Sequence, residues 1–313
     1  MSHFAVAICT AKRPNMLMSS LESVVALSLP SDKTLSIIVV ENDLESRSRD
    51  VIEKIRQTTT IPLRYVLEPH VGIPFARNCA LAAAIADGAD WIAMLDDDER
   101  AEPNWLVQLH AACLKFDAEI ATGPVRQIFD VAPPHWWKQP SRSRRSTGSL
   151  MNTAYTNNVL IRSRIIAANG LNLRFDEQLT FGAEDSDFFQ KAHEKGARMV
   201  WVAEACLVEQ VPSSRLTMRR SIDREHMVAV STTFAKVIRN GRARTSIRCL
   251  PNIVRRLVVG ALYLVAGLIA WPVSRATGEK VMFKGAVRIT KAWGSFCGLL
   301  GRTSNYYQFI DGA

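Results

Sequence analysis

The chain has 313 residues and a formal net charge of +9 at pH 7, with 48% hydrophobic and 22% charged residues. This length and composition allow one large domain or two ordinary domains with an ample core. Its six cysteines are scattered without CxxC or metal-like spacing, so reduced thiols in a cytosolic protein are the expected state.

Apolar runs alternate with helical segments over the first hundred residues. Buried strands are predicted at 4–11, 34–42, 63–68 and 91–96. Helices are predicted at 14–27, after the second strand as far as about 57, and at 74–88. This alternation is typical of a doubly wound α/β fold with a parallel sheet, and no signal peptide is predicted before its first strand. Ligands of such sheets bind beyond the carboxyl ends of the strands, where Glu41, Asp96 and the turn from Thr10 to Arg13 are expected.

The segment Trp91–Pro103 is the most informative part of the chain. A buried strand is followed at once by Asp96, Asp97, Asp98 and Glu99. Such a concentration of negative charge favours a divalent cation, and oxygen ligands suit Mg²⁺ or Mn²⁺. Because alternate residues of an extended segment share a face, Asp96 and Asp98 are expected to point to one ion and Asp97 away from it. The alternative is a solvated acidic turn that caps the next helix.

The middle of the chain continues this alternation and adds a long loop. The predictions are a helix at 103–116, a strand at 119–125, a loop at 126–150, a strand at 156–163, a helix at 181–196 and a strand-rich segment at 197–211. In the loop, Trp136 and Trp137 are expected either to stack on a sugar ring or to pack within the protein. The helix at 181–196 begins with three acids within four positions, which exceeds what helix capping needs.

The positive charge belongs to the last third of the chain. Residues 213–313 carry 17 Lys and Arg against 4 Asp and Glu, whereas residues 1–212 carry 22 against 26. This asymmetry indicates an anionic partner, either a membrane surface or nucleic acid. The uncharged run Leu257–Val273 favours the membrane, because a nucleic-acid-binding tail is polar and interleaved with aromatic residues. A spanning helix, a helix in the membrane interface and a buried core helix stay open.

Six segments of the chain match a known pattern in order: AICTAKRP, IIVVEND, EPHVGIPFARNCAL, MLDDDERAEP, TNNVLI and FGAEDSDF. Over about residues 3–215 the chain resembles the family 2 inverting glycosyltransferases of GT-A fold, and most of all bacterial exopolysaccharide enzymes of the succinoglycan-assembly kind. The resemblance implies a mixed α/β sheet flanked by helices over 1–212, with a nucleotide-binding half (1–103) and an acceptor half (104–212). The basic, partly apolar helical region 213–313 would then associate with the membrane.

The activity implied by the resemblance is the transfer of a sugar from a UDP-sugar, such as UDP-glucose, to a polyprenyl-linked or other saccharide acceptor. Mg²⁺ or Mn²⁺ would be the cofactor. The enzyme would work at the cytoplasmic face of the bacterial inner membrane, as a peripheral, interfacial or single-span protein, with other polysaccharide-assembly proteins as further partners and no nucleic acid. The QxxRW motif of processive relatives is absent, which favours a single addition per encounter.

The resemblance also implies roles for individual residues. Asp185 matches the catalytic base that takes the acceptor hydroxyl proton, and Glu184 would hydrogen-bond acceptor hydroxyls. Glu41 falls where the family usually has an Asp that contacts uracil, which is a departure from the pattern. The implied nucleotide-sugar contacts are Thr10, Arg13, Glu41, Asn42, Arg77, Asp96 and Asp97. The implied metal ligands are Asp98, Asp96 and Glu209. Acceptor contacts are implied at Asn157, Trp136 and Trp137, and diphosphate contacts at Arg219, Arg220 and Arg224.

Three other functions are weighed against this one. A nucleotidyltransferase would need a GxGxxG or GxxxxGK loop after the first strand, where this chain has TAKRP. A basic-tailed nucleic-acid-binding protein conflicts with the apolar run in the tail. A catalytically silent sugar-nucleotide-binding scaffold conflicts with the intact Asp96, Asp98 and Asp185.

Overall fold

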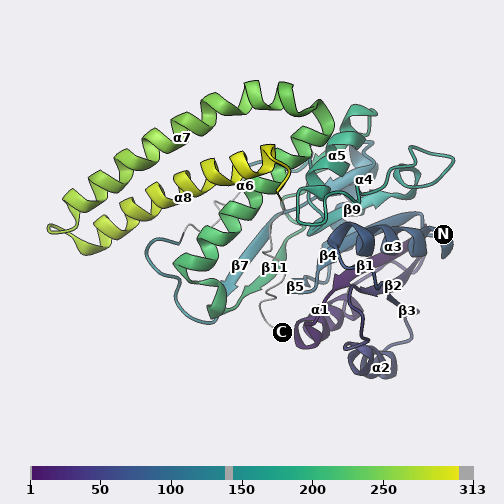
Figure 1. The fold of residues 1–313 in the computed structure, drawn as a ribbon. Coiled ribbons are helices and arrows are strands. Elements are labelled where there is room, and N and C mark those ends of the chain that lie inside the picture. Colours follow the sequence, from purple (N-terminus) through teal and green to yellow (C-terminus); the bar gives the residue numbers. More distant parts are fainter. Residues whose placement is uncertain (1, 138–143, 303–313) are drawn as a thin grey trace.

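A computed structural model describes residues 2–137 and 144–302 (Figure 1). In chain order the elements are β1 (Ser2–Thr10), α1 (Pro14–Val25), β2 (Lys33–Glu41), α2 (Arg49–Thr58), β3 (Leu63–Leu67), α3 (Ile73–Ala86), β4 (Trp91–Asp96), β5 (Glu99–Ala101), α4 (Trp105–Lys115), β6 (Ile120–Thr122), β7 (Val125–Phe129), β8 (Leu150–Met151), β9 (Asn158–Arg162), η1 (Ser163–Ile165), α5 (Glu184–Glu194), β10 (Met199–Trp201), β11 (Leu207–Val211), η2 (Ser213–Arg215), α6 (Met218–Asn240), α7 (Arg242–Ala270) and α8 (Arg275–Leu299). The strands and helices predicted for the first hundred residues are confirmed within a few positions.

The main sheet has eight strands in the order β3-β2-β1-β4-β9-β6-β10-β8. Strands β1 to β4 are parallel, as the alternation of strands and helices predicts. Strand β9 lies between β4 and β6 and is antiparallel to both, so the sheet is mixed rather than wholly parallel. The segment before β9 contains no described crossover helix, and a strand needs such a crossover to run parallel to its predecessor.

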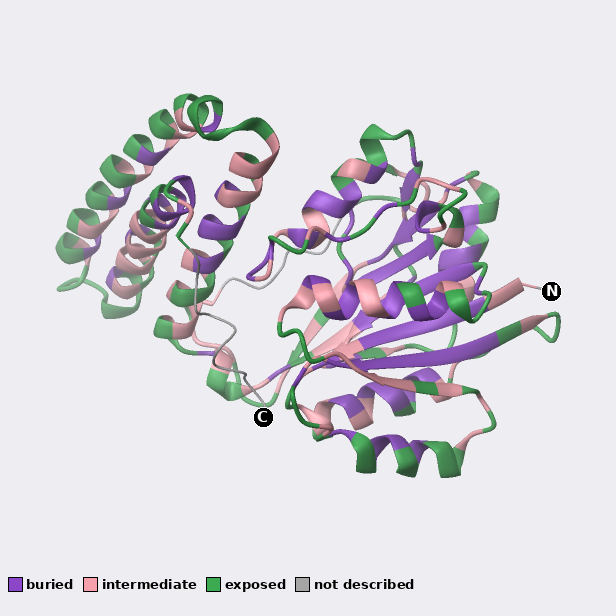
Figure 2. Cartoon of the chain, turned by 45° about the vertical axis from the view of Figure 1, so that its right-hand side comes forward, coloured by how far each residue is buried: buried purple, intermediate pink, exposed green. Residues whose placement is uncertain are grey.

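The two faces of this sheet are covered by helices, and each face has its own core. Phe4, Val6 and Ile8 of β1 pack with α1, α2 and α4, whereas the alternate Ala5 and Ala7 pack with α3 and α5. Successive side chains of a strand point to opposite faces, so a run of small and large residues fills both layers. The central strands β1, β2, β4, β6 and β9 are mostly buried between the helices, whereas the edge strands β3 and β8 are partly exposed (Figure 2).

A second sheet, which the sequence analysis does not anticipate, has three strands in the order β5-β11-β7. The strand predicted at 119–125 is divided into β6 in the main sheet and β7 in this one. The chain changes sheets at Gly123, where a Cβ atom would lie 2.1 Å from the carbonyl oxygen of Ala205. The second sheet pairs Glu209 of β11 with Glu99 of β5, beside the carboxyl end of β4.

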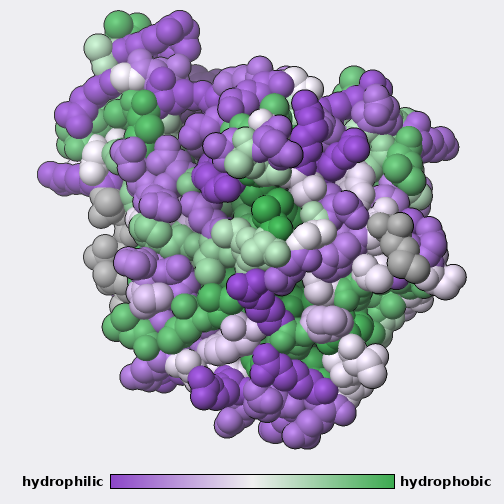
Figure 3. Space-filling model, turned by 90° about the vertical axis from the view of Figure 1, so that its right-hand side faces the viewer, coloured by the Kyte–Doolittle hydropathy of each residue, from purple (hydrophilic) through white to green (hydrophobic). Residues whose placement is uncertain are grey.

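The parallel strands β1 to β4 begin at one end of the molecule and finish toward the second sheet and α6 (Figures 1 and 2). The end at which they begin has a largely polar rim with apolar side chains gathered across its middle (Figure 3). The predicted site residues Thr10, Glu41 and Asp96 stand at the opposite, carboxyl ends of β1, β2 and β4.

After β11 the described chain, through residue 302, contains only helical elements. Helices α7 and α8 form a long antiparallel hairpin beside α6 (Figure 1). Helix α7 includes most of the uncharged run, and it is long and apolar enough to cross a membrane, with only 17% of its most apolar window buried. Of the three alternatives for this run, the buried core helix is therefore the one that the structure does not support. The division of the chain into domains at residue 212 stays a prediction.

Candidate functional site

The turn after β1 is tied to the acidic segment after β4. Thr10 Oγ1 donates a hydrogen bond to Asp97 Oδ2 at 2.7 Å, and Arg13 Nη1 donates to Asp97 Oδ1 at 3.1 Å. Within this turn Lys12 has a φ of +58°, a conformation that non-glycine residues rarely adopt. Burial raises the pKa of Asp97 to about 6, although Arg13 opposes the rise. Both carboxylate oxygens of Asp97 bind the protein, so Asp97 holds the turn in position, and its contact with the nucleotide stays a prediction.

The Asp98 and Glu209 carboxylates share one arginine. Arg215, which ends η2, lies with Nη2 2.6 Å from Asp98 Oδ2 and with Nη1 3.0 Å from Glu209 Oε1. Arg13 Nη1 lies 3.5 Å from the same Asp98 oxygen. A guanidinium suits this position because its planar fork donates to two carboxylates at once. The predicted metal ligands Asp98 and Glu209 thus lie together, bridged by a cation of the protein itself.

Arg215 is a site residue that the sequence analysis does not identify. The predicted diphosphate contacts Arg219, Arg220 and Arg224 lie in the first turns of α6. Arg215 follows β11 at the first basic position after Pro212, and only the pairing of β11 with β5 brings it to Asp98. The sole sequence signal is a basic residue close behind the strand that carries Glu209.

Asp96 and Glu99 complete the acidic cluster. Burial, together with the neighbouring carboxylates of Asp98, Asp97 and Glu209, raises the pKa of Asp96 to about 7 against the opposing effect of Arg77. Glu99 is 2% exposed, and burial raises its pKa well above the usual range. Like charges gathered in a low-dielectric environment disfavour ionisation, and a cation relieves this repulsion.

The donor set of this cluster fits Mg²⁺ or Mn²⁺, because it consists of carboxylate oxygens. Among residues 2–137 and 144–302, however, no three acidic, imidazole or thiol groups already surround one point as metal ligands. Asp98 and Glu209 contact Arg215 instead. A metal ion would therefore have to displace the guanidinium from these two carboxylates.

Arg77 joins the acidic segment to the start of α5. Its side chain is buried and forms an ion pair with Glu184, a residue 107 positions away. Burial lowers the pKa of Arg77, but Glu184, Asp185 and Asp96 outweigh this effect and hold it above its usual value. The two predicted motifs therefore meet at one buried cation.

Glu184 and Asp185 differ in their surroundings. Glu184 is 3% exposed and binds Arg77, and burial raises its pKa. Its predicted hydrogen bonds to acceptor hydroxyls stay a prediction. Asp185 is partly exposed, accepts a hydrogen bond from the Ser186 backbone N–H at 2.6 Å, and forms no ion pair within the described chain. The preceding Ala183 has a φ of +70°, and such strain is concentrated at functional sites.

Glu41 and Asn42 support the fold at the end of β2. Glu41 is wholly buried and accepts hydrogen bonds from the Ser48 backbone and hydroxyl, both at 3.0 Å, and from the Tyr65 hydroxyl at 2.5 Å. Asn42 donates to the Glu68 and His70 carbonyls and accepts from Gly72 N–H. These bonds give Glu41 and Asn42 structural roles at the end of β2, and their contacts with the nucleotide stay predictions.

The three predicted acceptor contacts have protein partners. Trp136 packs against Phe283 of α8 with ring centroids 4.8 Å apart, and Trp137 lies edge-on to Phe129 at 6.1 Å. Asn157 Nδ2 donates to Glu99 Oε1 at 3.2 Å. The packing alternative for the two tryptophans is thus the one observed. The predicted loop 126–150 is replaced at its ends by β7 and β8, and its residues 138–143 lie outside the described residues.

Comparisons with known proteins identify the family. The family model described as "Glycosyl transferase family 2" matches residues 5–172. "Succinoglycan biosynthesis protein ExoM" of Rhizobium meliloti (strain 1021) is 34% identical over 222 residues, which are 69% of each chain. The chain therefore belongs to glycosyl transferase family 2, and the predicted resemblance to exopolysaccharide enzymes is confirmed.

Solved structures show the same fold at low identity. A mannosyltransferase, PcManGT from Pyrobaculum calidifontis, in complex with GDP-Man and Mn²⁺, has a TM-score of 0.61 at 16% identity and covers 94% of this chain and 86% of its own. S. aureus TarS 1–349 in complex with UDP-GlcNAc has a TM-score of 0.56 at 15% identity, and the match covers 100% of this chain and 95% of the TarS chain. This chain spans 39% of a longer TarS structure. The GT-A fold is thereby confirmed.

Proposed function

We propose that the chain is an inverting, metal-dependent glycosyltransferase that moves a sugar from a UDP-sugar to a polyprenyl-linked saccharide. One observation carries the proposal: Arg77 binds Glu184 at the start of α5 and also interacts with Asp185 and Asp96. A nucleotide-binding half over 1–103 and an acceptor half over 104–212 would then meet at this arginine. The TarS structure that contains UDP-GlcNAc and the PcManGT structure that contains Mn²⁺ support a nucleotide-sugar donor and a metal.

In the proposed reaction, Asp185 takes the proton of an acceptor hydroxyl while that oxygen attacks the anomeric carbon of the donor sugar. The bond from this carbon to the diphosphate breaks as the new bond forms on the opposite face, so the configuration inverts. The carboxylate of Asp185 suits this role because it is partly exposed and forms no ion pair within the described residues. Arg77 and Glu184 fix the start of α5 and thereby orient Asp185.

Asp98, Asp96 and Glu209 would hold Mg²⁺ or Mn²⁺, whose chemistry is to neutralise the diphosphate leaving group. Arg215 would leave their carboxylates and bind a diphosphate oxygen in the same movement, because its guanidinium already stands at this position. Thr10 and Arg13 would line the nucleotide side of the site. Arg219, Arg220 and Arg224 stay candidates for further diphosphate contacts from the first turns of α6.

The likeness to ExoM supports a role in exopolysaccharide synthesis. The proposed place of work is the cytoplasmic face of a bacterial inner membrane. Helix α7, with its exposed apolar surface, supports association with that membrane. The absence of the QxxRW motif supports one sugar addition per encounter.

The test measures UDP release from a panel of UDP-sugars, with a membrane lipid extract as the acceptor source. It compares the wild type, Asp98→Ala and the surface control Asp32→Asn, each with Mn²⁺ or with EDTA. We expect one donor to be turned over by the wild type and the control, and turnover to be lost in EDTA and in Asp98→Ala. UDP release that withstands both EDTA and the Asp98 substitution would overturn the proposal.

A further inference from the structure

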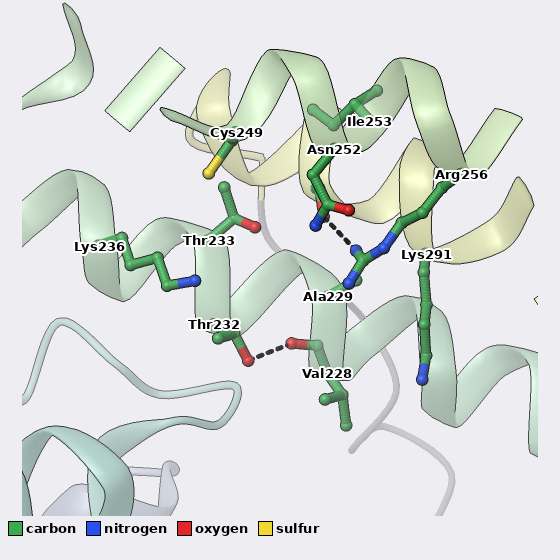
Figure 4. Close-up of a pocket in the computed structure, with 11 residues that line it drawn as sticks. Val228, Ala229, Thr232, Thr233, Lys236, Cys249, Asn252, Ile253, Arg256 and Lys291 are labelled. Atoms are coloured by element: carbon green, nitrogen blue, oxygen red, sulfur yellow. Dashed lines mark hydrogen bonds between the residues drawn. The ribbon is translucent and has the colours of Figure 1, made fainter. Parts of the chain in front are cut away.

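A cavity of about 230 Å³ lies between α6, α7 and α8 (Figure 4). None of the residues proposed for sugar transfer lines it. One face of α6 contributes Thr233 and Lys236, α7 contributes Arg256, and α8 contributes Lys291 and Ser295. At ~30 Å³ of liquid volume per water molecule, the cavity has room for several waters or for one small polar group.

The lining of this cavity is cationic. Lys236, Arg256 and Lys291 belong to it, and no Asp or Glu does. Lys291 is paired with Glu225 at 2.8 Å, whereas Lys236 and Arg256 form no ion pair within the described chain. Arg256 Nη1 donates instead to the Ser295 hydroxyl at 3.3 Å. Two uncompensated cations beside hydroxyl donors are the surroundings that a phosphate group requires.

The cavity stands at the basic end of an exposed apolar surface. Arg256 directly precedes Leu257, from which α7 continues without a charge to its end. Leu262 and Leu268 of this stretch are each 63% exposed, and Ile269 is 71% exposed. A continuous exposed apolar surface of this kind marks a contact with a membrane or another protein, and the adjoining basic cavity favours a membrane of anionic lipids.

Helix α8 determines how the hairpin can meet that membrane. A Cβ atom on Gly260 would lie 3.1 Å from the Gly285 carbonyl oxygen, and one on Gly267 would lie 3.0 Å from the Gly278 carbonyl oxygen, so the two helices touch along this seam. Lys280 and Lys284 of α8 are exposed at the same level. If the hairpin spanned a membrane, placing each of these charged lysines at the bilayer centre would cost about 2.5–3.5 kcal/mol or more. These costs favour a hairpin that lies along the interface, with the apolar surface of α7 toward the acyl chains.

We propose that the cavity between α6, α7 and α8 binds the phosphate of an anionic membrane phospholipid. The phosphate lies between Lys236 and Arg256 and accepts hydrogen bonds from the Thr233 and Ser295 hydroxyls, while the acyl chains follow the apolar surface of α7. The inference goes beyond sugar transfer and rests on the membrane association proposed above.

Cys249 provides a direct readout, because it lines the cavity and is only partly buried. The full-length chain is alkylated with iodoacetamide, and modification of each cysteine is followed by peptide mass spectrometry. Three probes are added separately: dioctanoyl phosphatidylglycerol, dioctanoylglycerol and inorganic phosphate. We expect phosphatidylglycerol alone to slow alkylation of Cys249 at least about fivefold, with Cys206 as the unaffected internal control.

Two double variants each remove two positive charges, one from the cavity and the other from the exposed surface of α8. Lys236→Gln/Arg256→Gln is expected to lose the protection of Cys249, whereas the matched Lys280→Gln/Lys284→Gln is expected to keep it. Circular dichroism checks that both fold, and the single Lys236→Gln replaces the first double if that double does not. Protection that persists in the cavity variant, or that is equal with inorganic phosphate, would overturn the proposal.

Flotation with phosphatidylglycerol vesicles separates this proposal from membrane association. Wild-type chain that floats without protection of Cys249 would leave the association standing and refute the cavity site. Chain that does not float would refute both, while UDP-sugar turnover reports on sugar transfer independently of either.

Discussion

The Arg77–Glu184 pair shows how a single buried contact supports a site. Arg77 is 9% exposed and Glu184 is 3% exposed, so neither charge is solvated well enough to stand alone. A buried ion pair adds little net stability, but removal of one partner leaves an uncompensated buried charge. The pair therefore fixes the start of α5 against α3 instead of adding to the overall stability of the fold.

Arg77→Met is expected to lower the free energy of unfolding by about 3–5 kcal/mol, since Glu184 remains buried without its cation. The double variant Arg77→Met/Glu184→Leu removes both charges, and we expect it to recover most of this loss. Urea denaturation followed by circular dichroism measures both. A double variant as unstable as Arg77→Met would show that the pair itself stabilises the fold.

Arg215→Gln is expected to strengthen Mn²⁺ binding in the absence of nucleotide. The guanidinium contacts both Asp98 and Glu209, so a metal ion must displace it from those carboxylates. Its removal should tighten the Mn²⁺ dissociation constant by about tenfold, which corresponds to about 1.4 kcal/mol. Electron paramagnetic resonance of free Mn²⁺ measures the constant, with the exposed Arg244→Gln as the control. Unchanged or weaker Mn²⁺ binding would contradict the assignment of these ligands.

On the scale of single residues, the sequence predicts site residues that belong to local motifs and misses those that depend on strand pairing. Asp96, Asp98 and Asp185 are recognisable from their neighbours along the chain. Arg215 reaches Asp98 only because β11 pairs with β5, a contact between segments more than a hundred residues apart. Glu41 departs from the motif, which usually has Asp at this position, and its side chain turns inward to Ser48 and Tyr65.

At the scale of elements, the first four strands and their helices follow from hydrophobic alternation. The later strands do not, because their order depends on contacts that the pattern does not contain. Residues 119–125 look like one strand, but Gly123 permits a close approach of the Ala205 carbonyl group, and the chain passes there from one sheet to the other. A single strand pattern can thus serve two sheets.

The glycine seam between α7 and α8 gives a prediction for the hairpin. A side chain at Gly267 would meet Met282 Cγ at 2.4 Å and the Met282 backbone nitrogen at 2.8 Å. Gly267→Leu should therefore separate the helices and destabilise the hairpin by about 1–3 kcal/mol, as overpacking does. Hydrogen exchange of α8 measures the loss, and Ala266→Leu at the neighbouring exposed position is the control. Equal protection in both variants would show that the seam is not tightly packed.

His110 of α4 gives a prediction for pH. It is 7% exposed and packs edge-on against Phe4 and Trp91. Burial lowers its pKa below the ordinary 6.5, with a further contribution from Lys33, so the folded chain binds the proton less readily than the unfolded chain. Its effect on stability is therefore absent above pH 6.5 and becomes unfavourable as the pH falls below that value.

His110→Phe should accordingly flatten the decline in stability between pH 7 and pH 5. Urea denaturation at several pH values, compared with the wild type, measures the slope. A decline of the same steepness in both proteins would contradict the role assigned to His110.

On the scale of the whole molecule, the acidic site and the basic helices lie on the same side of the fold. Asp96 and Asp98 lie at the carboxyl end of β4, on the side of the sheet that faces α6, and α6 leads directly into the basic hairpin (Figure 1). Trp136 packs on Phe283 of α8 and links the transferase fold to the hairpin. A saccharide held on a membrane lipid would thus meet the site from the side of the molecule that carries the hairpin.

The central claim is that Asp185 acts as the catalytic base beside an intact nucleotide site. The most direct measurement is single-turnover transfer of labelled sugar to a lipid acceptor, together with calorimetric binding of UDP, in the wild type, Asp185→Asn and the exposed control Asp223→Asn. The account predicts that Asp185→Asn binds UDP as the wild type does and transfers sugar about 10²–10⁴-fold more slowly. Transfer by Asp185→Asn at the rate of the wild type and the control would contradict it.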